Sequence, residues 1–162
     1  MSTKRDNFQL SDKKLMQLAI SLAENQKYFT GTNPSVGCVI TKNNKIISYG
    51  VTGKNGRPHA EINAINKKKS KDLYNSSIYV SLEPCTHYGK TPPCTNTLIK
   101  KKFKKVFFSH TDEDKRTKNT AKNILEKYKI NVKKNFINDK AKNLYSEYDF
   151  IRKYNFPYVI GK

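Results

Sequence analysis

Three short stretches organise the chain: Pro58-His59-Ala60-Glu61, Pro84-Cys85 and Pro93-Cys94. They supply one imidazole and two thiols, each directly after a proline. One histidine and two cysteines can hold a zinc ion that keeps its fourth tetrahedral position open for water. Proline suits the first turn of a helix, where the helix dipole favours thiolate over thiol, so we expect the ligands at helix starts. The expected zinc ligands are His59, Cys85 and Cys94.

Glu61 supplies a carboxylate beside the first of these ligands. It lies two positions after His59, so on a continuous helix the two side chains face different ways, and we expect Glu61 to be a flanking base rather than a ligand. A water on such a zinc ion loses its proton near a pKa of about 7. A neighbouring carboxylate can pass that proton to a ring nitrogen and a leaving amine. These residues therefore favour hydrolytic deamination of a nucleobase-like ring.

Two structural alternatives stand beside this hypothesis: a closed structural zinc site, or three unrelated core residues. A closed site needs a fourth ligand, and the only other cysteine is Cys38, in the apolar run 36–40. Three cysteines make an odd number, and the sequence carries no secretory signal. Both observations favour metal binding over a disulfide framework.

Length and composition predict a single domain over residues 1–162. The polar segment Met1 to Leu10 and the absence of any apolar run near about 18 residues predict a cytoplasmic protein without a membrane span. The net charge of +19 suggests polyanion binding, but only four of the 32 basic residues are arginine and the lysines lie in scattered clusters. Arginine is the residue that recognises phosphates and bases through two hydrogen bonds. Specific nucleic-acid binding is therefore not expected, although adhesion to polyanions at low salt is.

Apolar periodicity and turn residues predict strands alternating with helices. This order is typical of an α/β protein with a three-layer α/β/α arrangement, and we expect a central mixed sheet of about five strands. It places Cys85 just after a central strand, where open α/β sheets carry their sites. The expected strands cover 36–40, 45–49, 78–82, 106–108 and the region of 132. The expected helices cover 12–26, 59–69, 117–128 and 139–153, with another beginning at 92–93.

The spacing of the motif is specific. His59-Ala60-Glu61 is followed by Ala64-Ile65, by a gap of 18 residues to Pro84-Cys85, and by eight residues before Cys94. The arrangement closely resembles the signature of the zinc-dependent cytidine and deoxycytidylate deaminase superfamily. The resemblance implies a cytidine-deaminase-like fold.

The eight-residue insert between the cysteines narrows the resemblance. Base and nucleoside deaminases, including the tRNA adenosine editors, typically have two residues there. The insert 86–93, together with Thr32-Asn33-Pro34-Ser35-Val36-Gly37, is similar to the deaminase domain of the bifunctional riboflavin-biosynthesis protein, a diaminohydroxyphosphoribosylaminopyrimidine deaminase. The similarity runs from the first helix to Tyr158-Val159.

This resemblance implies the substrate 2,5-diamino-6-ribosylamino-4(3H)-pyrimidinone 5′-phosphate, which loses its 2-amino group as ammonia. It implies zinc at the three ligands and Glu61 as the proton shuttle. It also implies that Asn33 holds the pyrimidinone and that His87 and Lys90 reach the phosphate. The alternatives are ordinary ones: Asn33 as a turn residue, His87 capping backbone groups, and Lys90 as a solvated loop lysine.

The chain departs from this family in two places. Thr52 stands where the family usually has a histidine, seven residues before the zinc histidine. Residues 112–117 contain no glycine, whereas the family usually shows Asp-Pro-Asn-Pro followed by glycines, so we expect a different contact with the ribose. The sequence stops at Gly161-Lys162, where the family's reductase domain would begin, and no reductase activity is expected. By analogy with the family we expect a homo-oligomer.

Two other functions remain open at this stage. One is another deaminase of the superfamily, acting on a nucleotide or on tRNA, which the long cysteine insert disfavours. The other is a catalytically silent zinc fold that binds RNA through its lysines, which the presence of Glu61 disfavours. RNA binding that resists salt would favour the second.

Overall fold

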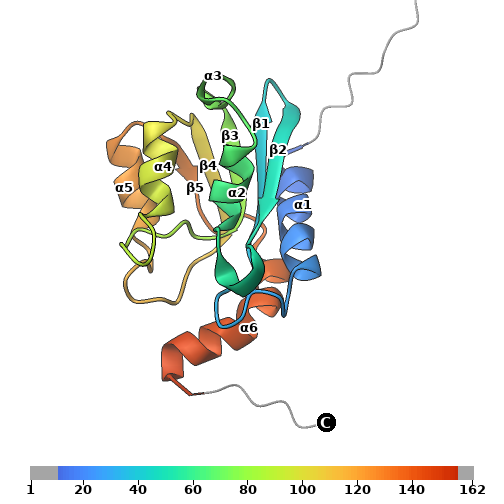
Figure 1. Cartoon of the computed structure of the whole chain (residues 1–162), viewed down its shortest axis with the longest axis vertical. Helices are drawn as coiled ribbons and strands as arrows, with labels where there is room; N and C mark the ends of the chain where they lie inside the picture. Colours follow the sequence, from blue (N-terminus) through green and yellow to red (C-terminus); the bar gives the residue numbers. More distant parts are fainter. Residues whose placement is uncertain (1–10, 157–162) are drawn as a thin grey trace, which may run out of the picture.

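A five-stranded mixed sheet with helices on both faces forms the described part of the protein, residues 11–156 of a computed structural model (Figure 1). The strand order is β2-β1-β3-β4-β5. The strands are β1 (Gly37–Lys42), β2 (Lys45–Val51), β3 (Ser77–Leu82), β4 (Lys105–His110) and β5 (Asn131–Lys133). The helices are α1 (Asp12–Asn25), the 3-10 turn η1 (Lys54–Gly56), α2 (Ala60–Asn66), α3 (Ser70–Leu73), α4 (Cys94–Lys100), α5 (Ala121–Lys127) and α6 (Asn138–Tyr154).

The sheet combines an antiparallel and a parallel half. Strand β1 pairs antiparallel with β2 and with β3, whereas β3, β4 and β5 run parallel. Asn43 and Asn44 connect β1 to β2 with φ angles of 49° and 60°. This left-handed pair makes the two-residue turn that matches the twist of a hairpin. The predicted mixed sheet is confirmed.

Helices cover both faces of the sheet, so the predicted three-layer α/β/α arrangement is also confirmed. Helix α1 packs against β1 and β3, and α6 lies beside β4 and α1. Helix α2 packs against β2 and β1, with α4 next to it and α5 beside α4 and β5. Gly37 permits close packing on the first face, because a Cβ there would overlap the carbonyl oxygen of Ala19 in α1.

Tyr145 anchors α6 to the centre of the sheet. Its side chain is buried, and its hydroxyl lies 2.6 Å from Ser81 Oγ in β3. The same hydroxyl donates to the carbonyl oxygen of Ser35 at 2.9 Å. A buried hydroxyl must be hydrogen-bonded, so these contacts fix both the helix and the loop that enters β1.

Two predicted helix boundaries were wrong. Helix α2 ends at Asn66 rather than at residue 69, because Lys69 takes up an extended backbone and becomes the N-cap of the short helix α3. Helix α5 begins at Ala121 rather than at residue 117. The N–H of Ala121 donates a hydrogen bond to the carboxylate of Glu83, the residue that follows β3. Glu83 therefore caps the N-terminus of α5 although it lies far from the helix in the sequence.

Several sequence predictions fall on residues outside the described part of the chain: the polar segment Met1 to Leu10, the similarity at Tyr158-Val159 and the end at Gly161-Lys162. Among the described residues, no helix combines the length and the apolar character needed to cross a membrane.

Candidate active site

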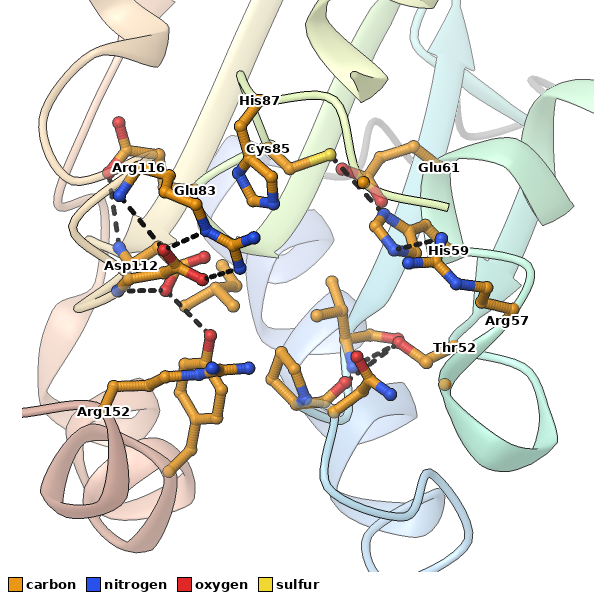
Figure 2. Close-up of a pocket in the computed structure, with 18 of the residues that line it drawn as sticks. Thr52, Arg57, His59, Glu61, Glu83, Cys85, His87, Asp112, Arg116 and Arg152 are labelled. Carbon is orange, nitrogen blue, oxygen red and sulfur yellow. Dashed lines mark hydrogen bonds and ion pairs between the residues drawn. The ribbon is translucent and has the colours of Figure 1, made fainter. Parts of the chain in front are cut away.

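A cavity of about 300 Å³ opens at the carboxyl ends of β3 and β4 (Figure 2). Because β1 runs antiparallel to β3, the loop that enters β1 reaches the same edge of the sheet. The start of α2, the loops after β3 and β4 and one side of α6 complete the wall. The cavity therefore collects side chains from segments that are far apart in the sequence.

The three expected zinc ligands come together beside this cavity: His59 and Cys85 line it, and Cys94 is buried next to them. Nδ1 of His59 lies 3.3 Å from Sγ of Cys94 and 3.6 Å from Sγ of Cys85. The three candidate ligand atoms all lie within 4.8 Å of one another. Tetrahedral zinc with Zn–S of about 2.3 Å and Zn–N of about 2.0 Å requires ligand atoms roughly 3.5–3.8 Å apart. The donor set and its spacing fit a zinc ion.

The protonation of the two thiols also suits a metal. A hydrogen bond from Cys94 and a further one with His59 lower the pKa of Cys85 to about 4 against the effect of burial. The same hydrogen bond and burial raise the pKa of Cys94. A zinc ion would bind both sulfurs as thiolates and would release the proton that the Cys94 thiol holds.

The prediction that every ligand begins a helix holds for two of the three. His59 is the N-cap of α2, and Cys94 is the first residue of α4. For Cys85 it was wrong, because this residue lies in the loop after β3. Its sulfur nevertheless receives a helix N–H, since the backbone nitrogen of Cys94 donates to it at 3.2 Å. The free N–H group at the start of α4 therefore stabilises the thiolate form of Cys85, although Cys85 itself lies in a loop.

Glu61 lies in the first turn of α2, with only 4% of its surface exposed. Its carboxylate points toward His59 and Cys85 at the floor of the cavity (Figure 2). Burial raises the pKa of this carboxyl. It stands beside the candidate ligands without belonging to the group that could hold the metal.

The other three predicted site residues, Asn33, His87 and Lys90, also line the cavity. The Asn33 amide donates to the Asn55 carbonyl at 3.4 Å, and Gly56, with a φ of +87°, leaves the space that this amide needs. Nδ1 of His87 lies 2.9 Å from Thr117 Oγ1. Lys90 is exposed on the loop between the two cysteines.

Thr52 stands at the position where the similar family usually has a histidine, and its side chain forms hydrogen bonds with backbone groups. Its side chain is buried, and its oxygen accepts the N–H of Val36 at 2.9 Å. Its hydroxyl also lies within hydrogen-bonding distance of the Pro34 carbonyl, at 3.3 Å. The hydroxyl therefore holds the loop before β1, although Thr52 still lines the cavity.

The glycine-free loop after β4 is held by carboxylates in place of glycines. Glu83, buried at the end of β3, accepts the backbone N–H groups of Asp112 at 3.3 Å and of Asn119 and Ala121 at 3.0 Å. Asp112 Oδ1 accepts the Asp114 N–H at 2.8 Å and the Tyr148 hydroxyl at 3.0 Å. Burial raises the pKa of Asp112 to about 6. The loop is thus fastened to β3 and to α6.

All three arginines of the described chain line this cavity: Arg57, Arg116 and Arg152. The sequence analysis did not assign them to the site. Their scarcity was a usable signal, since only four of 32 basic residues are arginine and the surface charge is otherwise carried by lysine. Where composition favours lysine, a position that keeps arginine is a candidate for hydrogen bonding in a fixed geometry.

Comparison with known proteins places this site in a family. Residues 10–110 match the family model described as the cytidine and deoxycytidylate deaminase zinc-binding region. The chain belongs to the cytidine and deoxycytidylate deaminase family. The matched region contains all three candidate zinc ligands and Glu61, and the superfamily predicted from the motif is confirmed.

Two relatives of this chain differ in length. A protein of Buchnera aphidicola (subspecies Acyrthosiphon pisum) named diaminohydroxyphosphoribosylamino-pyrimidine deaminase is 39% identical over 133 residues, which are 82% of this chain and 90% of the relative. The riboflavin biosynthesis protein RibD of Aquifex aeolicus is 45% identical over 101 residues, 62% of this chain but only 28% of the relative. The chain therefore spans nearly all of one relative and under a third of the other.

Solved structures agree with the fold. RibD of Acinetobacter baumannii is 37% identical, with a TM-score of 0.84 over 91% of this chain and 41% of the RibD chain. A bifunctional deaminase and reductase from Thermotoga maritima is 32% identical, with a TM-score of 0.83 over 90% of this chain and 42% of its own. The predicted cytidine-deaminase-like fold is confirmed.

Proposed function

We propose that the protein catalyses zinc-dependent hydrolytic deamination of 2,5-diamino-6-ribosylamino-4(3H)-pyrimidinone 5′-phosphate. The products are 5-amino-6-ribosylamino-2,4-pyrimidinedione 5′-phosphate and ammonia, in a step of riboflavin biosynthesis. The observation that carries this proposal is the Buchnera relative, whose name is that of this deaminase and of which the chain covers 90%. Because the chain covers only 28–41% of the Aquifex and Acinetobacter RibD proteins, the proposal is limited to deamination.

His59, Cys85 and Cys94 would hold the zinc ion. Their spacing and the thiolate character of Cys85 support this assignment. Zinc bound there would supply the Lewis acidity that makes hydroxide accessible near neutral pH. The two thiolates and a neutral imidazole balance the charge of the metal.

Glu61 would move the protons of the reaction. It would accept one proton from water and deliver it to the ring nitrogen next to the reacting carbon, and would then take a second proton from the hydroxyl added to that carbon and pass it to the departing amine. Burial supports this role, because a raised carboxyl pKa lies closer to neutrality and eases both uptake and release. The covered position of Glu61 also limits access of bulk water to these protons.

Asn33, His87 and Lys90 would bind the substrate, Asn33 at the pyrimidinone and the other two at the phosphate. Their positions on the cavity wall support these roles. His87 is steadied by Thr117, whereas Lys90 remains on an exposed loop whose two ends are the cysteine ligands. The cytoplasmic location and the homo-oligomer expected from the sequence stay predictions, as does the absence of specific nucleic-acid binding.

Ammonia release by zinc-loaded protein tests the proposal. The protein is offered, in parallel, the phosphorylated diaminopyrimidinone, deoxycytidylate, cytidine and a tRNA, with metal-free protein as the control. We expect turnover of the diaminopyrimidinone alone. Turnover of only one of the other substrates would replace the proposal with a different deaminase of the same family.

A further inference from the structure

The three arginines of the cavity differ in the groups that their guanidinium groups contact. Arg116 donates through Nε and Nη2 to the Asp114 carboxylate, at 2.9 and 2.5 Å. Arg152 stacks over the Tyr148 ring at 5.2 Å from its centroid and makes no ion pair among the described residues. The charge of Arg116 is therefore paired with a carboxylate, whereas the Arg152 guanidinium is held against an aromatic ring of α6.

Arg57 lies on the opposite wall, and no ion pair among the described residues involves it. Nη1 donates to Thr91 Oγ1 at 2.7 Å, which brings the guanidinium to the loop between the cysteines. Nη1 also lies 3.4 Å from Nε2 of His59. When His59 binds a metal through Nδ1, its neutral ring carries the proton on Nε2 and accepts nothing from Arg57. The remaining donors of Arg57 then need another acceptor.

Gly89 lies beside this guanidinium. A Cβ placed on Gly89 would lie 3.7 Å from Nη2 of Arg57 and 4.0 Å from Nε2 of His87, so these two groups flank a backbone position without a side chain. Lys90 follows directly, is exposed, and takes part in no ion pair of the described chain. Two uncompensated cations and an imidazole thus surround the same short stretch of backbone at the mouth of the cavity.

We propose that Arg57 joins His87 and Lys90 in holding the 5′-phosphate of the substrate beside Gly89, an inference that rests on the proposed function. A phosphate dianion is attracted to neighbouring cations without a carboxylate partner, and Arg57 and Lys90 make no ion pair among the described residues. The planar guanidinium can donate two parallel hydrogen bonds to phosphate oxygens, which a lysine cannot. The bond to Thr91 holds Arg57 in place before the ligand arrives.

Paired substrates test the subsite: the phosphorylated diaminopyrimidinone and its dephosphorylated ribosylamino analogue. For Arg57→Gln we expect kcat/KM on the phosphorylated substrate to fall on the order of tenfold to a hundredfold, mainly through KM, with little change on the analogue. Arg57→Lys should lose less than Arg57→Gln, because lysine keeps the positive charge but cannot donate two parallel hydrogen bonds to the phosphate. Lys54→Gln is the matched control, because Lys54 is exposed three residues away and does not line the cavity.

Calorimetric binding of ribose 5-phosphate to zinc-loaded protein gives a readout that does not depend on turnover. We expect Arg57→Gln to weaken binding by at least about tenfold and Lys54→Gln to leave it unchanged. Two results for Arg57→Gln would overturn the assignment: an equal fall in kcat/KM on both substrates, or an unchanged affinity for ribose 5-phosphate. Arg57 would then serve only to hold the loop at Thr91. A third outcome separates the two proposals. If wild-type protein binds ribose 5-phosphate, Arg57→Gln weakens that binding, and the wild-type protein deaminates none of the substrates, the proposed function is refuted and the phosphate subsite stands.

Discussion

The backbone N–H of Cys94 donates a hydrogen bond to Sγ of Cys85 at 3.2 Å. The residue after it continues the connection, since both the backbone N–H and the hydroxyl of Thr95 bond to the Cys85 carbonyl at 3.2 Å. The two cysteine ligands are therefore joined by protein hydrogen bonds alone. These hydrogen bonds hold the two candidate zinc ligands close together, which lowers the entropy cost of binding a metal there.

Replacing Cys94 by alanine should abolish stoichiometric zinc binding while much of the fold survives. The Thr95 bonds to Cys85 remain in the variant, so the start of α4 stays attached. Metal content of the purified protein and chelator competition measure the change. Cys38→Ala is the matched control, because Cys38 is a buried thiol of β1 outside the ligand group. Normal zinc in Cys94→Ala, or loss of zinc in Cys38→Ala, would contradict the ligand assignment.

Changing Glu61 to glutamine should keep the zinc and remove most of the activity. Glutamine has nearly the same shape but cannot carry a proton between water, ring and amine. Loss of a general acid–base group costs about two to four orders of magnitude in kcat. Steady-state rates at matched zinc content measure the effect. A zinc-replete variant with wild-type turnover would remove Glu61 from the mechanism.

Glu83→Gln should loosen the loop after β4. The Glu83 carboxylate accepts three backbone N–H groups, with Ala121 on Oε1 and both Asp112 and Asn119 on Oε2. An amide nitrogen in either position leaves at least one N–H group without an acceptor, at a cost of about 1–3 kcal/mol in the free energy of unfolding. Denaturant unfolding and amide hydrogen exchange across the loop measure this cost.

The control for that experiment is Glu126→Gln. Glu126 makes an exposed pair with Lys122 at 3.7 Å one helical turn away, which contributes about 0.5 kcal/mol or less. If Glu83→Gln destabilised the protein no more than Glu126→Gln does, the anchoring role of Glu83 would be wrong.

The pair between His110 and Asp149 should make stability depend on pH. Nε2 of His110 lies 2.7 Å from Asp149 Oδ2. Burial acts to lower the pKa of His110, but hydrogen bonds with Asp149 and Asn138 outweigh it and raise the pKa. A folded-state pKa above the unfolded value of about 6.5 means that the contribution is complete below pH 6.5 and is lost as pH rises through the folded pKa.

Asp149→Asn tests this dependence. The variant should lose on the order of 1 kcal/mol of unfolding free energy below pH 6.5 and little above the folded pKa. Denaturant titrations of both proteins across the range give the difference curve. A difference that is constant with pH, or larger at high pH, would show that the ion pair does not contribute in this way.

Local patterns predicted the parts of the fold that local chemistry determines. The hairpin follows from Asn43-Asn44, which accepts left-handed backbone, and α1 begins where the Ser11 side chain accepts the Lys14 N–H. The candidate zinc ligands could be predicted because their residue types and spacing are specific to one kind of site. The structure brings these side chains together at the end of the central strand β3.

Long-range contacts explain what the sequence did not predict. The start of α5 depends on Glu83, which lies far back in the chain and reaches the helix only after the sheet has formed. Arg152 reaches the cavity because the buried Tyr145 hydroxyl sets the position of α6 against β3. Apolar periodicity indicates that α6 has a buried side, but it does not indicate which polar side chains reach a cavity formed by other segments.

The most direct test of the proposed function is the source of oxygen in the product. Zinc-loaded protein is given the phosphorylated diaminopyrimidinone in water enriched in oxygen-18, and ammonia and product are measured together. The account predicts one ammonia released per product molecule and one labelled oxygen at the carbon that carried the 2-amino group. Unchanged substrate without ammonia, or ammonia without a labelled product, would contradict hydrolytic deamination by this protein.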